Sequence, residues 1–336
     1  MTTLLSHRAS DAFLELALAG ERRQAVGLTL DLLDEGFSLP AVLDSVVGVA
    51  QREMGRRWQH AEVSVADEHL VTGISQAALT AISANDHRQA AMGTVVVACA
   101  EGDWHALPSQ MFAESLRAAG QGVLHLGASV PAADVAMLLE RRRPEALLVT
   151  CSLPLSYLGV ASLAEAAHRT HTPVLAGGGA LNAARACNLG ADAWAADVTN
   201  AVEILTQWRS DPPEVGAHPI GLEPAAVLLD RQARVLADRA MSALTEGSSA
   251  WAGEDDQQQE RMRSDLVAIV RFLAAARVVD DDEVFGGFSS WLQEVHSVRD
   301  VPVAALVAGL AALAPLVREI DERGAALAEA AAARLG

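Results

Sequence analysis

The sequence has few aromatic residues: they make up only 4% of its 336 residues and include a single tyrosine. Apolar residues still account for 51% of the chain, so its cores must be built mainly from Ala, Leu and Val. Such a composition favours helices and buried parallel strands. At roughly 100–200 residues per domain, two or three domains are expected.

Basic residues are also scarce, because 25 Lys and Arg stand against 43 Asp and Glu, a formal net charge of −18. Phosphate backbones are bound largely through Lys and Arg, so this balance argues against a nucleic-acid partner. The short run of three arginines at 141–143 suits the end of a helix, where it would complement the helix dipole.

Cysteine is nearly absent, with Cys99, Cys151 and Cys187 at no metal-ligand spacing. The odd count argues against a disulfide framework. No signal peptide is visible, and no apolar run is long enough to cross a bilayer. We therefore expect a cytoplasmic protein with no membrane partner.

The periodicity of apolar residues divides the chain into three domains and a linker. Residues 1–88 repeat at helical spacing, with a capping-box pair at Ser64 and Asp67, and predict an antiparallel four-helix bundle. Residues 89–210 alternate short apolar runs with helical stretches, which predicts βαβ units and a parallel sheet. The runs are 95–98, 123–126, 146–149 and 173–176.

Residues 211–221 are rich in Pro and Gly and predict a linker. Helical periodicity then resumes and predicts an all-α domain over 222–336. Its expected helices are 223–245, 257–278, 281–297 and 302–334.

A polar segment, Asp103-Trp104-His105, follows the first predicted strand. Ligands of parallel sheets bind beyond the carboxyl ends of the strands, so this histidine would lie at a binding site. Asp103 could accept the hydrogen of one ring nitrogen, as carboxylates do for metal-bound histidines. By itself, such a pair is more often a solvated loop histidine.

The segment resembles the Asp-x-His-x-x-Gly motif of cobalamin-binding domains, although Pro108 stands at the motif's glycine position. In that family the histidine is the lower ligand of cobalt. A Ser-x-Leu segment and a glycine pair line the slot for the nucleotide tail, and residues 150–153 and 177–178 match them. The resemblance implies that His105 binds cobalt, and that further cofactor contacts come from Asp103, Trp104, Thr150, Ser152, Leu153, Gly177 and Gly178.

Within the bundle, Trp58 is followed after nine residues by Glu68 and His69. By themselves, such residues are more often a core tryptophan and a solvated Glu-His pair. The spacing resembles that of light-sensing regulators of the CarH type, where these residues accommodate the adenosyl group of adenosylcobalamin on its upper face. In those regulators a histidine follows the tryptophan, whereas this sequence has Gln59 at that position and His60 next. Which residue, if any, binds cobalt after photolysis therefore stays open.

That resemblance covers residues 10–210 and leaves out the DNA-binding domain of those regulators, because the sequence begins almost directly with the bundle.

The C-terminal third concentrates large rings and arginines, the rings being Trp251, Phe272, Phe285, Phe288 and Trp291. A helical dimerisation or signalling domain would explain them. The order of domains resembles the photocobilins, which bind adenosylcobalamin and the bilin biliverdin in one chain. This implies a globin-like domain with bilin contacts from Arg271, Trp291 and His296. No cysteine follows Cys187, so the bilin would be held non-covalently.

The expected fold class is α/β plus all-α: a four-helix bundle, a Rossmann-like cobalamin-binding domain and a globin-like helical domain. The expected function is a light sensor rather than an enzyme. The protein partners to consider are a second copy of the chain, in a homodimer, and a downstream signalling enzyme. The alternative is a corrinoid carrier protein for methyl transfer, while a mutase subunit would need a substrate barrel that this sequence lacks.

Overall fold

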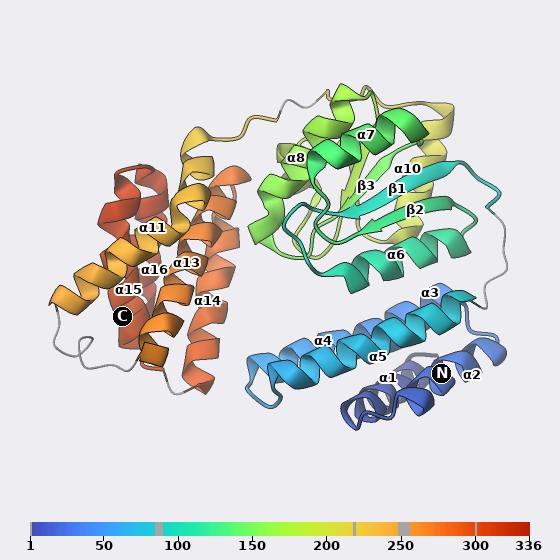
Figure 1. Cartoon of the computed structure of the whole chain (residues 1–336), viewed down its shortest axis with the longest axis horizontal. Coiled ribbons are helices and arrows are strands. Elements are labelled where there is room, and N and C mark those ends of the chain that lie inside the picture. The colour runs from blue at the N-terminus through green and yellow to red at the C-terminus, as the bar shows by residue number, and fades with distance from the viewer. Residues whose placement is uncertain (1, 85–89, 218–219, 248–255, 300) are drawn as a thin grey trace.

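The computed structural model describes residues 2–84, 90–217, 220–247, 256–299 and 301–336. Figure 1 shows a helical bundle at the N-terminus, an α/β domain above it, and a second helical domain at the C-terminus. In the part of the chain that is described, no helix is both long and apolar enough to cross a membrane. Trp251 lies outside the described residues.

The N-terminal bundle contains the four helical segments that the periodicity predicts. They are α1 (Thr2–Leu18), α2 (Arg22–Asp34), the continuous run α3–η1–α4 (Leu39–Val42, Leu43–Val47, Gly48–Gln59) and α5 (Val65–Ala84). The middle segment η1 is a π-helical turn, a feature often found near functional sites. The capping box at the start of α5 is present, because Ser64 Oγ accepts from the Asp67 amide while Asp67 accepts from the Ser64 amide.

The α/β domain is built on a five-stranded parallel sheet of order β2-β1-β3-β4-β5. Its strands are β1 (Thr94–Cys99), β2 (Gly122–Gly127), β3 (Leu147–Thr150), β4 (Val174–Gly177) and β5 (Ala193–Ala195). Four of them were predicted; β5 has only three residues and no β-branched side chain, so its sequence carries little strand signal. The strand order reverses between β1 and β3, which is where ligands of such sheets bind.

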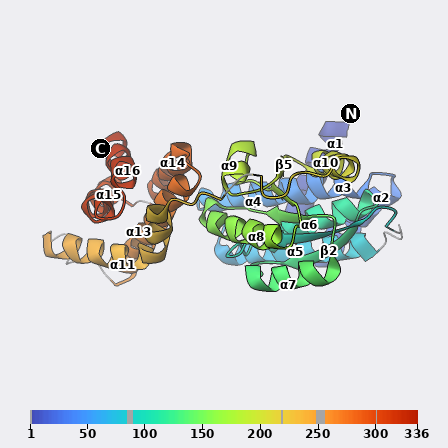
Figure 2. The same cartoon turned by 90° about the horizontal axis from the view of Figure 1, so that it is seen from above.

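Helices cover both faces of this sheet (Figures 1 and 2). They are α6 (Ala106–Ala118) and α10 (Val198–Ser210) on one face, with α7 (Ala132–Arg142) and α8 (Tyr157–Arg169) on the other, completed by η2 (Pro154–Ser156) and α9 (Ala183–Asn188). Each face of the sheet has its own apolar core, and alternate residues of β1 point into one or the other. Val95 and Val97 pack with α6, while Val96 and Ala98 pack with α7 and α8. The predicted Rossmann-like domain flanked by helical regions is confirmed.

The C-terminal domain is entirely helical where it is described. Its helices are α11 (Pro224–Gly247), α13 (Asp256–Val278), α14 (Asp282–Val298), α15 (Val303–Arg318) and α16 (Glu322–Leu335). The prediction of one helix over 302–334 is wrong, because the chain turns back at Asp321. The buried Asp321 carboxylate accepts from Arg277 Nε at 2.7 Å, and the turn lets the apolar faces of α15 and α16 pack together.

Candidate functional site

The loop after β1 holds His105 in one orientation through the buried carboxylate of Asp103. One carboxylate oxygen accepts from His105 Nδ1 at 2.7 Å and from the His105 amide at 3.0 Å. The other oxygen accepts from the amide of Ser152, after β3, at 2.7 Å. Among the described residues, none is hydrogen bonded to His105 Nε2. A histidine fixed through Nδ1, with Nε2 available, is the arrangement that metal-bound histidines adopt.

These hydrogen bonds also set the ionisation of the pair. The Asp103 carboxylate raises the pKa of His105 above its ordinary value, against the opposing effect of burial, and the charge of Glu68 adds to the rise. Burial opposes ionisation of Asp103 most strongly. The bonds from His105 and from the Ser152 amide outweigh that effect and leave the pKa of Asp103 below its ordinary value.

Two glycines allow the loops around this histidine to approach one another. A Cβ on Gly159 of α8 would lie 1.9 Å from the carbonyl oxygen of Glu101, so only glycine fits beside the β1–α6 loop. Gly178 has φ of +105°, and a Cβ there would lie 2.5 Å from the carbonyl oxygen of Cys151. Gly178, directly after β4, therefore accommodates the protein's own loop after β3.

The residues matched to the nucleotide slot lie together at the carboxyl edge of the sheet. Thr150 pairs in register with Cys99 of β1 and with Gly177 of β4. Ser152 and Leu153 follow directly, and the Leu153 side chain is 40% exposed. Pro108, the departure from the family motif, falls in the first turn of α6, where the missing amide hydrogen costs nothing.

The bundle packs against α6, the helix that follows His105, because Leu107 lies in the apolar core of the bundle. The charge of Glu68, near the start of α5, contributes to the raised pKa of His105. The Thr72 hydroxyl donates to Glu68 Oε1 at 3.1 Å and also contacts Gln51 Oε1 at 3.3 Å. His69 lies 3.6 Å from Glu68 and is mostly exposed.

Trp58 lies at the end of α4, where the bundle meets the C-terminal domain. Its ring stacks on that of Trp291 in α14, with centroids 6.3 Å apart and planes at 17°. The next two residues also have partners in α14: Gln59 donates to Glu294 at 2.6 Å, and His60 Nε2 lies 3.4 Å from the same carboxylate. His60 Nδ1 lies 2.8 Å from a backbone carbonyl of its own helix.

The three residues predicted to contact a bilin occupy separate surroundings. Arg271 donates to Asp230 at 3.1 Å and to the Leu155 carbonyl of the α/β domain at 3.1 Å. Trp291 packs between Trp58 and Phe288. His296 is 4% exposed; its Nε2 lies 2.9 Å from an Asp265 oxygen, and its Nδ1 has no hydrogen-bond partner among the described residues.

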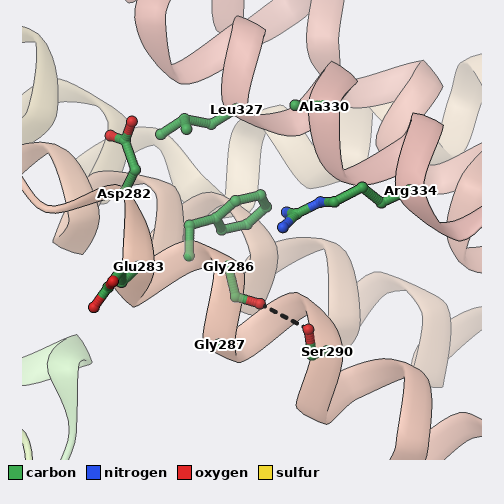
Figure 3. A pocket seen from close by; sticks show the side chains of 9 residues that line it. Asp282, Glu283, Gly286, Gly287, Ser290, Leu327, Ala330 and Arg334 are labelled. Carbon is green, nitrogen blue, oxygen red and sulfur yellow. Dashed lines mark hydrogen bonds between the residues drawn. The ribbon is translucent and has the colours of Figure 1, made fainter.

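A groove of about 740 Å³ lies elsewhere on the C-terminal domain, between α14 and α16. Figure 3 shows Arg334 of α16 reaching over it towards Gly286 and Gly287 of α14, with Asp282 and Glu283 at one end. Arg271, Trp291 and His296 do not line this groove.

Sequence reasoning missed residues that act through the backbone or through another domain. Gly159 gave no signal, because one glycine in a helical stretch has many explanations. Thr72 was overlooked as well, although it lies one helical turn after Glu68. Arg299 was noticed only as one arginine among several, yet its guanidinium lies over the ring of Trp58. No periodicity in the sequence links two positions that far apart.

Comparison with known families assigns the first two domains. Residues 93–206 match the family model of a B12 binding domain, and residues 9–83 match a second model with the same description. No curated protein matches the sequence.

Among solved structures, the monomethylamine corrinoid protein of Methanosarcina barkeri is similar at 18% identity and a TM-score of 0.52, covering 60% of this chain and 98% of its own. The methanol:cobalamin methyltransferase complex of the same organism (20% identity, 60% and 80% coverage) scores 0.35. A cobalamin-binding protein of Desulfitobacterium hafniense (19%, 59% and 97%) scores 0.33. The first similarity shows a shared fold, and the two lower scores support no conclusion.

Proposed function

Since the chain carries B12-binding domains over residues 9–83 and 93–206, we propose that it is a light sensor that holds adenosylcobalamin between them. The observation that carries the proposal is that the bundle packs on α6, the helix that begins directly after His105. Leu107 of α6 lies in the apolar core of the bundle, so the bundle covers the domain beside the loop that holds His105. A corrin between the two domains would have His105 on one side and the bundle on the other.

Each residue in the proposal has a distinct task. His105 Nε2 would hold the cobalt, and Asp103 keeps the hydrogen on Nδ1 by accepting from it at 2.7 Å. Glu68, held by Thr72, accepts hydrogen bonds from ribose hydroxyls of the adenosyl group. Trp58 and His69 complete the upper side, where an aromatic ring offers apolar cover.

Adenosylcobalamin supplies a cobalt–carbon bond that light breaks. Without the adenosyl group, Glu68 and Trp58 would lack its contacts, and the bundle would have less preference for its present position against the α/β domain. A change in the position of the bundle is the signal that a downstream signalling enzyme or a second copy of the chain would detect.

The rival function, a corrinoid carrier for methyl transfer, has support from the shared fold of the monomethylamine corrinoid protein. Both functions use His105 in the same way. They differ above the cobalt, because a methyl group needs no contact from Glu68 or Trp58.

The experiment that separates them compares adenosylcobalamin with methylcobalamin. We expect tighter binding of adenosylcobalamin in the dark, and a green-light change in the spectrum accompanied by faster hydrogen exchange in α4 and α5. Equal affinities for the two cobalamins, with hydrogen exchange in α4 and α5 that does not change under light, would favour the methyl carrier.

The Trp58→Ala variant tests the upper face directly. The preference for adenosylcobalamin should fall about tenfold, within the few kcal/mol that burying one ring contributes. Trp208→Ala is the matched control, because Trp208 is a half-buried tryptophan on α10 outside the site. A preference unchanged by Trp58→Ala would remove this residue from the upper face.

Biliverdin binding in the C-terminal domain is a second part of the proposal, supported by the buried Nδ1 of His296. A nitrogen that is buried without a partner is costly, and a pyrrole system would give it one. In the described structure, however, Arg271 and Trp291 are engaged elsewhere.

The full-length protein is therefore mixed with biliverdin and followed by absorption. A red-shifted band that is extracted by acid and urea, and that shifts back in His296→Ala, is the expected result. No spectral change would leave a helical signalling domain, and a band that stays attached to the denatured chain would contradict non-covalent binding.

A further inference from the structure

An arginine of the C-terminal domain binds the end of α4, in addition to the contacts of Gln59 and His60 with Glu294. Arg299 donates from Nη2 to the Trp58 carbonyl at 2.9 Å and from Nη1 to the Gln59 carbonyl at 3.2 Å. The last carbonyl groups of a helix lack partners within the helix, and a cation is favoured there by the helix dipole. Both effects make this end of α4 a good binding place for a guanidinium group.

The ring of Trp58 is held by the same domain. The Arg299 guanidinium carbon lies 4.9 Å from the centroid of the Trp58 ring, within the range of a cation–π contact. Trp291 stacks on Trp58 at 6.3 Å and is itself 6.0 Å from Phe288, whose ring lies 3.8 Å from Phe272. A row of rings thus extends from the bundle into the core of the C-terminal domain.

The C-terminal domain is in turn fixed to the α/β domain. Arg185 of α9 pairs with Asp281 at 2.8 Å, and Asn188 donates to the Val279 carbonyl at 2.6 Å. The apolar core beside α7 and α8 also continues without a break into the C-terminal domain. The C-terminal domain therefore acts as a brace between the domain that carries His105 and the end of α4 that carries Trp58.

We infer that Arg299 and Trp291 are positioning residues that set the place of Trp58 above the cobalt, so that the C-terminal domain helps to select the upper ligand. This inference rests on the proposed function, because it assigns Trp58 to the adenosyl side. The coupling is reciprocal: if the brace favours adenosylcobalamin, adenosylcobalamin tightens the brace by the same factor.

The test measures the ratio of the affinities for adenosylcobalamin and methylcobalamin in full-length variants. Arg299→Met keeps an unbranched apolar stem but removes both carbonyl bonds and the charge. We expect the preference for adenosylcobalamin to fall about tenfold, as for loss of a charged hydrogen bond. The preference of Arg299→Lys for adenosylcobalamin should lie between those of the wild type and Arg299→Met, because an ammonium group cannot bond both carbonyls in a planar fork. Arg239→Met is the control, since Arg239 pairs with Glu319 on the outer surface of the same domain.

Trp291→Leu provides an independent second variant that leaves Arg299 in place. It should lower the same ratio, and the double variant should lose less than the product of the two single effects, because both act on Trp58. Hydrogen exchange adds a readout of the reciprocal effect: adenosylcobalamin should protect the amides of α14 more than methylcobalamin does, and Arg299→Met should abolish that difference.

The outcomes separate this inference from the function on which it rests. A wild-type protein without preference for adenosylcobalamin contradicts the light-sensor proposal itself. A wild-type preference that stays unchanged in Arg299→Met, Arg299→Lys and Trp291→Leu overturns the brace alone.

Discussion

The two sides of the proposed cobalamin site are built in different ways. Below the corrin, His105, Asp103 and Ser152 belong to one domain, and both oxygens of Asp103 are hydrogen bonded within it. Above it, Glu68 is held by Thr72 of the bundle, while Trp58 is held by Arg299 of the C-terminal domain. The lower side is thus preorganised locally, whereas the upper side depends on how three domains meet.

This difference suits a sensor. A lower ligand that stays in place keeps the cofactor bound, while an upper side assembled between domains can respond when its ligand is lost. The following predictions test whether the lower side is as rigid, and the upper side as adjustable, as their contacts indicate.

The largest expected effect is that of His105→Ala. The variant should fold, because the side chain is about half exposed. Cobalamin should bind roughly 100-fold more weakly, a loss at least as large as the greatest that outer partners of metal ligands cause. The visible spectrum should change to that of a cofactor without a nitrogen ligand from the protein. An unchanged spectrum and affinity would show that His105 is not the ligand.

Gly159→Ala should destabilise the lower side by about 1–3 kcal/mol, as overpacking generally does. The added Cβ would meet the Glu101 carbonyl at 1.9 Å, so the loop that leads to His105 must move. Urea denaturation measures the loss, with Gly179→Ala as control, because a Cβ there meets nothing within 4 Å. Equal stability of the two variants would mean that the loop is less rigid than its contacts indicate.

Asp103→Asn should weaken cobalamin binding by about tenfold, the lower end of the effect of an outer metal-site partner, because the amide oxygen still accepts one hydrogen bond. The amide group can no longer serve both His105 and the Ser152 amide as an acceptor. Titration with cobalamin gives the affinity. A loss equal to that of His105→Ala would indicate that Asp103 supports the loop as a whole.

The smallest effect is expected on the upper side, from Thr72→Val. Loss of the hydroxyl that donates to Glu68 should reduce the preference for adenosylcobalamin by about threefold to tenfold, the range of one hydrogen bond. Affinity for methylcobalamin should not change. Thr80→Val on the same helix is the control, because the Thr80 hydroxyl donates to the backbone carbonyl of Gln76. A comparable change in the control would point to helix stability instead.

Much of the fold could be predicted from local patterns. Apolar residues that repeat with the helical period of 3.6 indicated the bundle and the C-terminal helices, and short continuous apolar runs indicated four strands. Burial selects apolar residues at those positions. The break at Asp321 was not predicted. Asp321 is the N-cap residue of α16, a position that Asp favours, but its carboxylate bonds to Arg277 and not to the amides of its own helix. The strand β5 was not predicted, because it has only three residues.

The candidate site also has one part that follows from the local sequence and one part that depends on tertiary contacts. The sequence by itself determined that Asp103 and His105 lie two residues apart after a buried strand, and the structure keeps that pair as a local hydrogen bond. Only the tertiary structure decided that Gly159 must be small and that Arg299 and Trp291 contact Trp58. The reason is physical: a strand followed by a short loop places its own residues, whereas contacts between residues more than 230 positions apart depend on how whole domains pack.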